Sequence, residues 1–297
     1  NKFKLLQFTR YKNNLGISRY TIYLCHIKIM MRKITTIITL TLILNSCGEY
    51  QKVLKSDDYN YKYTKAVAYY EAEDFNRAMP LFNELSTVLK GTARMQEVSF
   101  YYAYCNYSIG DNFMAAYLFR NYTINHPNSK HTEECAYMSA YCYYLEAPIY
   151  SLDATNTRKA IKELQVFIDR YPTSDRIDRC NILIDELRGK LSAKAFENAK
   201  QYFITSNYKS AIIALDNVLI DFPSYMNREE VHCLIVKSAY LLAINSISTK
   251  VEGRLKATLD AYAQFEDNYP ESDLLEDLES TYNKTQNTLT ELKEKKR

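Results

Sequence analysis

The 297-residue sequence contains no tryptophan and only six glycines and six prolines. Such low glycine and proline content leaves few tight turns and favours long helices. Acidic residues are missing from the first 46 positions, which hold eight Lys and Arg. Removing these eight from the total of 38 leaves 30 basic against 35 acidic residues from position 47 onward, a net charge of about −5. A basic nucleic-acid footprint is therefore absent, and no nucleic-acid partner is expected.

Signatures of common catalytic and metal sites are also missing. The sequence has no Gly-x-Gly-x-x-Gly, P-loop, His-Glu-x-x-His or Gly-x-Ser-x-Gly motif, and its four histidines are scattered. Beyond position 47 five cysteines remain, an odd number with irregular spacing and no Cys-x-x-Cys pair. We expect them to be small buried core residues. The sequence therefore predicts no enzyme, no cofactor and no metal site.

Residues 30–46 have the order of a lipoprotein signal peptide. Arg32 and Lys33 are basic, and the apolar run that follows, Ile34–Leu44, is too short to span a bilayer, which needs about 20 residues. The run then ends in Leu-Asn-Ser-Cys47, which reads as a lipobox. We predict that cleavage makes Cys47 the new N-terminus and that several acyl chains hold it on a membrane. The alternative is a short buried strand or helix that ends in a cysteine.

The segments around this signal are interpreted from its position. Met30 and Met31 stand directly before it, so residues 1–29 are expected to be an upstream extension outside the native protein. A signal peptide with a long basic region is the alternative. After Cys47, residues 47–56 are expected to be a lipid-anchored linker, and 57–297 the folded domain.

Four segments close in the same way, with an apolar helical run ended by proline and followed within two residues by serine. Proline cannot continue a helix and serine is a favourable N-cap, so each junction predicts one helix ending and another beginning. The prolines are Pro127, Pro172, Pro223 and Pro270. Twelve and eight residues before them stand the small and large apolar positions of a tetratricopeptide repeat: Ala115 and Phe119, Ala160 and Leu164, Ala211 and Leu215, Thr258 and Tyr262. A first repeat matches through Ala66, Tyr69, Ala78 and Phe82, and the fourth adds Ala199 and Tyr202.

The predicted fold is all-α. We expect a right-handed α-solenoid of about five tetratricopeptide-like helix-turn-helix repeats, closed by a C-terminal capping helix. The fourth repeat should begin with a long helix, about Asp175 to Ile204. Inserted loops are expected at 147–156 and 245–252. The repeats are predicted at 57–91, 95–127, 131–172, 175–223 and 228–270.

The first helices of the first three repeats place aromatic side chains at positions that line the concave face of such an array. Tyrosine combines flat apolar area with a hydroxyl, which suits peptide recognition. Simple packing between helices is the alternative for each of them. The candidate peptide-binding residues are Tyr63, Tyr70, Phe100, Tyr104, Tyr107, Tyr137, Tyr141 and Tyr144.

Several segments within 47–297 carry a family resemblance: Cys47–Ser56, Phe75–Phe82, Glu133–Ala136, Lys159–Pro172 and Lys194–Ala199. Together with the order of lipobox, repeats and terminal helix, they make the chain resemble the BamD family of outer-membrane β-barrel assembly lipoproteins, in the form found in Bacteroidetes-like bacteria. The resemblance implies a non-catalytic scaffold, lipid-anchored to the outer membrane and facing the periplasm. It also implies binding to a BamA-like barrel assembly protein and to unfolded outer-membrane proteins, with accessory lipoproteins as further partners. A general tetratricopeptide adaptor for envelope or cell-wall proteins is the alternative function.

Overall fold

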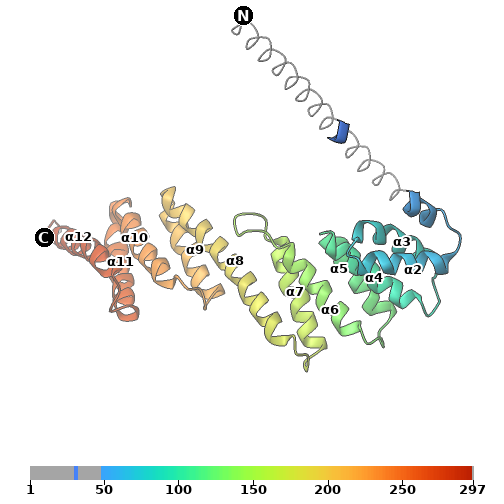
Figure 1. Ribbon diagram of the computed structural model, residues 1–297. Coiled ribbons are helices and arrows are strands. Elements are labelled where there is room, and N and C mark those ends of the chain that lie inside the picture. The colour runs from blue at the N-terminus through green and yellow to red at the C-terminus, as the bar shows by residue number, and fades with distance from the viewer. Residues whose placement is uncertain (1–29, 33–47, 296–297) are drawn as a thin grey trace, which may run out of the picture. The chain divides into compact units, whose positions relative to one another are not determined.

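A computed structural model describes residues 30–32 and 48–295 (Figure 1). Cys47, the upstream residues 1–29 and most of the predicted signal peptide lie outside the described residues. Every labelled element of the described part is a helix, and none combines the length and apolar character needed to cross a bilayer. The helices are α2 (Tyr59–Glu71), α3 (Phe75–Val88), α4 (Met95–Ser108), α5 (Asn112–Asn125), α6 (Thr132–Leu145), α7 (Thr155–Arg170), α8 (Ile177–Ile204), α9 (Tyr208–Asp221), α10 (Arg228–Ile244), α11 (Ser248–Asn268) and α12 (Leu274–Glu294).

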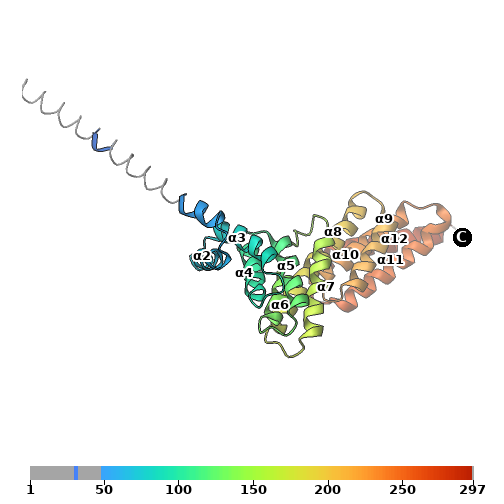
Figure 2. The same cartoon turned by 90° about the vertical axis from the view of Figure 1, so that its right-hand side faces the viewer.

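The chain divides into two compact units, residues 1–109 and 110–297. The described part of unit 1 contains α2, α3 and α4 with a short helical segment at 48–54. In unit 2, α5 to α12 follow in chain order and each helix packs on the next (Figures 1 and 2). The helix bounds match the five predicted repeats, and α12 is the predicted terminal helix. The all-α, tetratricopeptide-like fold is thus confirmed.

Burial confirms the repeat register. The small and large apolar residues chosen from the pattern lie in the core, where small side chains let two helices cross closely. Two tyrosines of the pattern are exceptions: Tyr202 is 46% exposed and Tyr69 is only half-buried, so neither is a fully buried core residue. The buried set comprises Ala66, Ala78, Phe82, Ala115, Phe119, Ala160, Leu164, Ala199, Ala211, Leu215, Thr258 and Tyr262.

The four proline junctions have one backbone geometry. In each, the C-cap residue directly precedes the proline, and its ψ lies between 58° and 71°, outside the helical region. The cause is the proline ring, which clashes with a helical conformation in the residue before it. The helices therefore end where the sequence predicts. These C-cap residues are His126, Tyr171, Phe222 and Tyr269.

The serines after the prolines do not act as predicted. Ser174 is not the N-cap of α8; its hydroxyl instead accepts from the backbone N–H of Arg176, which holds the turn before the helix. Ser129 and Ser272 do the same for the N–H groups two residues on. The Ser174 hydroxyl also donates to Oε1 of Glu133 in α6 at 2.6 Å, so it links adjacent repeats. A serine hydroxyl can accept one hydrogen bond and donate another, so Ser174 holds its turn and links the repeats at the same time.

The two predicted insertions differ in structure. Residues 147–154 are irregular, and α7 begins at Thr155. In the other, α11 already begins at Ser248, so the expected loop at 245–252 is wrong for its second half. The insertion lengthens the helix instead, supported by the Glu252–Lys256 ion pair one turn apart.

The five cysteines beyond Cys47 are all buried and free, as predicted. Burial raises the pKa of Cys105 and Cys142 to about 12, and that of Cys180 to about 11. They are neutral thiols at neutral pH and pack as small apolar groups. The cysteines are Cys105, Cys135, Cys142, Cys180 and Cys233.

Candidate peptide-binding surface

The α2 row consists of Tyr63, Val67 and Tyr70, spaced four and three residues apart on one side of the helix. All three are half-buried and pack against the core of unit 1. The Tyr70 ring packs against other aromatic rings, with its centroid 4.8 Å from that of Tyr101 and 5.5 Å from that of Phe75. Its ring therefore belongs to an aromatic cluster at the core of unit 1.

Tyr63 is tied to the next repeat. Its hydroxyl donates to Oε2 of Glu97 at 2.6 Å, and the guanidinium of Arg94 lies 4.9 Å from the ring centroid. Burial and the hydrogen bond to Glu97 raise the pKa of Tyr63 well above its usual value. The hydroxyl therefore stays protonated, and its one proton is used in the hydrogen bond to Glu97.

The α4 row consists of Phe100, Tyr104 and Tyr107, with the same spacing in the same unit. The Phe100 and Tyr104 rings are 4.7 Å apart, and those of Tyr104 and Tyr107 meet edge to face at 6.4 Å. All three are half-buried. Each ring keeps part of its area open to solvent while its orientation is held by its neighbours, which reduces the entropy lost on binding.

The α6 row, in unit 2, consists of Tyr137, Tyr141 and Tyr144. Consecutive rings are stacked, with centroids 5.8 Å and 5.7 Å apart and interplanar angles of 12° and 18°. The Tyr144 hydroxyl donates to Oε2 of Glu186 at 2.5 Å, and this bond raises the pKa of Tyr144. At the other end, the Arg176 guanidinium lies 5.2 Å from the Tyr137 centroid. This row is therefore a ladder of rings fixed at both ends by residues at or within α8.

The charged neighbours of these rows were not identified from the sequence. Glu97 and Glu186 lie 34 and 42 residues after the tyrosines they bind, about one repeat further along the chain. Comparing positions one repeat apart could have found them. The structure thus places each predicted aromatic residue in a short row on the first helix of its repeat, with carboxylate or guanidinium groups beside two of the rows.

The groups that these rows present are aromatic rings and hydroxyls. Among the described residues, no group of three or more His, Cys, Asp or Glu side chains is placed to hold a metal ion. Half-buried tyrosines with fixed rings offer apolar contact to a peptide side chain and hydroxyls to its backbone.

Comparison with models of known protein families shows to which family the chain belongs. The model of the outer membrane lipoprotein family YfiO matches residues 55–253, which are 199 of the 297 residues. The chain belongs to this family. The matched region includes every helix from α2 to α10, and with them all three aromatic rows of this YfiO-family protein. No curated protein matches the chain.

Proposed function

We propose that this outer membrane lipoprotein is a non-catalytic scaffold of the β-barrel assembly machinery, of the type found in Bacteroidetes-like bacteria. It binds a BamA-like barrel assembly protein and unfolded outer-membrane protein substrates. Cys47 carries the lipid anchor, and the folded repeats face the periplasm. The family match over residues 55–253 carries the proposal.

The aromatic rows support the substrate part of the proposal. An unfolded barrel protein presents extended strands in which apolar and polar side chains alternate. Rings spaced along a helix, as in Tyr137, Tyr141 and Tyr144, offer repeated apolar contacts to such a strand. The Tyr63 hydroxyl donates its proton to Glu97, and its oxygen can still accept a hydrogen bond from a backbone N–H of the substrate.

Purification of a C-terminally tagged protein from gently solubilised outer membranes tests the assembly role. We expect a barrel protein with periplasmic repeat domains to co-elute at near-equal stoichiometry. Recovery of the protein alone, or with cell-wall proteins, would favour the adaptor function instead. In a parallel fractionation, Cys47→Ala should release the protein from the membrane or leave it uncleaved, because the acylated thiol is lost.

Substitution within the rows tests the substrate surface. Tyr104→Ala and Tyr141→Ala remove the middle ring of the α4 and α6 rows and should weaken binding of a peptide with alternating aromatic residues. The matched control is Tyr117→Ala on α5, a tyrosine outside the rows that is 57% exposed. Circular dichroism should show unchanged helicity in all three. Equal affinities for all variants would assign the rows to packing alone.

A further inference from the structure

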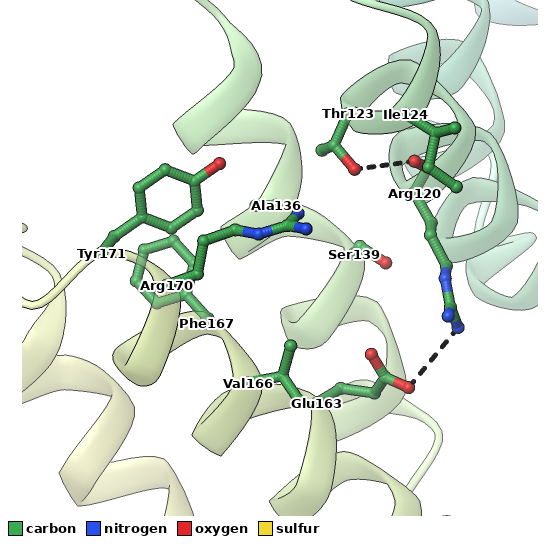
Figure 3. Close-up of a pocket in the computed structure, with 10 residues that line it drawn as sticks. All are labelled: Arg120, Thr123, Ile124, Ala136, Ser139, Glu163, Val166, Phe167, Arg170 and Tyr171. Carbon is green, nitrogen blue, oxygen red and sulfur yellow. Dashed lines mark hydrogen bonds and ion pairs between the residues drawn. The ribbon is translucent and has the colours of Figure 1, made fainter. Parts of the chain in front are cut away.

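A pocket of about 260 Å³ lies within unit 2, between α5, α6 and α7 (Figure 3). The pocket is lined by Ala136 and Ser139 from α6, by Ile124 from α5 and by Val166 from α7. Figure 3 shows Arg170 and Tyr171 at one end and the Arg120–Glu163 pair at the other. The pocket lies on a different side of α6 from the tyrosine row, because positions 136 and 139 are displaced around the helix from 137, 141 and 144.

The hollow exists because α6 has two small residues where later repeats have larger ones. Ala136 and Ser139 stand nine and twelve residues after Pro127. The same offsets from the next two prolines give Asn181 and Ile184, then His232 and Ile235. Ile184 is only 3% exposed, so the larger side chain at this position of the next repeat is buried.

Two hydroxyl groups that line the pocket have no proton left to donate to a ligand. Ser139 Oγ donates to the backbone oxygen of Ala116 at 3.0 Å, and Thr123 Oγ1 donates to that of Arg120 at 2.8 Å. Both donors are therefore used within the protein. The side chains of Ile124 and Val166 are 64% and 47% exposed, so apolar area remains open to a partner.

The rim has an unequal charge. At one end Arg120 is paired with Glu163, with 3.7 Å between the nearest nitrogen and oxygen. At the other end no hydrogen bond or ion pair of Arg170 is found within the described part of the chain, and the adjacent Asp169 accepts from Gln165 instead. Two residues before the other junction prolines stand Asn125, Asp221 and Asn268, so a cation at this position is particular to the third repeat.

We propose that this pocket binds a segment of a partner protein that presents one apolar side chain beside a carboxylate. The apolar side chain enters the hollow over Ala136, and the carboxylate pairs with the guanidinium of Arg170, which can bind it through two parallel hydrogen bonds. The volume is below the roughly 300–1,000 Å³ of sites that enclose a whole small molecule, and it suits a single side chain. The pocket uses none of the side chains of the aromatic rows, so it can be tested separately from the proposed substrate surface.

Short labelled peptides, acetylated and amidated at their ends, test the proposal by fluorescence anisotropy with the full-length protein in detergent. The first carries Leu-Glu in a Gly/Ser background, the second Leu-Gln and the third Ala-Glu. We expect the Leu-Glu peptide to bind on the order of tenfold more tightly than either of the others, since each lacks one of the two contacts. A fourth peptide ending in leucine with a free carboxylate distinguishes a chain terminus from an acidic side chain as the source of the anion.

Two variants place the effect at the pocket. Arg170→Gln should remove the preference for Glu over Gln, whereas Arg158→Gln, an exposed arginine on the same helix outside the pocket, should keep it. Ala136→Leu should fill the hollow and remove the preference for Leu over Ala, with thermal unfolding as the check on folding. Equal binding of the Leu-Glu and Leu-Gln peptides, equal effects of the two arginine variants, or no binding of any peptide would overturn the proposal.

Discussion

Lys62 of α2 and Glu84 of α3 form an ion pair with 2.6 Å between Nζ and Oε1, and Lys62 is only 1% exposed. The same ammonium donates to the backbone oxygen of Leu54 at 3.1 Å. One buried cation therefore joins two helices of unit 1 to the helical segment that follows the predicted lipidation site. A buried charge is tolerated because it is paired and hydrogen-bonded in this way.

Replacing this lysine should destabilise unit 1. Lys62→Met keeps the volume but leaves the Leu54 carbonyl and Glu84 without their donor, which we expect to cost about 1–3 kcal/mol in the free energy of unfolding. The matched control is Lys65→Met on the same helix, whose pair with Glu49 is screened by solvent and should contribute much less. Urea unfolding measures both, and similar losses for the two variants would contradict the assigned role of Lys62.

Replacement by alanine should change the stability of the protein in opposite directions at two glycines. Gly110, in the turn before α5, has a φ of +86°, which is a left-handed conformation. Gly189 lies inside α8. At both glycines, an added Cβ would have no neighbouring atom within 4 Å. Gly110→Ala should destabilise by roughly 1 kcal/mol through backbone strain alone. Gly189→Ala should stabilise by roughly 0.5–1 kcal/mol through helix propensity. Thermal midpoints that move in the same direction would show that these conformations are not the cause.

Overpacking tests the repeat register. Ala211 is fully buried in α9 where the helices of the fourth repeat cross, so Ala211→Leu should destabilise by about 1–3 kcal/mol. Ala263 of α11 is exposed, and Ala263→Leu adds the same atoms where there is room for them. Chemical denaturation should separate the two variants clearly. An unchanged midpoint for Ala211→Leu would mean that this position does not lie at the crossing.

Acidification should weaken unit 2 through His232. Burial, and secondly the charge of Arg228, lower the pKa of this histidine below its usual 6.5 in the folded state. The unfolded chain therefore takes up a proton more readily, and stability falls as the pH drops below about 6.5. In thermal unfolding between pH 8 and pH 5, His232→Gln should lose less stability than the unchanged protein. An identical pH dependence would show that His232 makes no contribution.

The positions of the helices could be predicted because their determinants are local. Pro172 and Pro270 end helices whatever surrounds them, since the clash involves only the preceding residue. The spacing of Ala160 and Leu164 from Pro172 reflects the helical period, which is a property of the backbone. The lipobox before Cys47 is likewise a linear pattern, although that residue lies outside the described part of the chain.

The contacts between repeats could not be predicted in the same way. Nothing near Lys62 in the sequence distinguishes it from the half-exposed Lys65, and only the approach of α3 and residues 48–54 buries it. The segment 248–252 is predicted to be a loop, but it forms the first turn of α11, in which Glu252 pairs with Lys256.

The sequence by itself therefore determined where the helices end at proline and most of the side chains that face the core, because these depend on backbone geometry and hydrophobic period. The tertiary structure alone decided which charged groups lie beside Tyr63 and Tyr144, and that Ser139 opens a pocket beside Arg170. Those arrangements depend on pairs of residues about 30 to 40 positions apart, whose meeting is set by the packing of one repeat on the next.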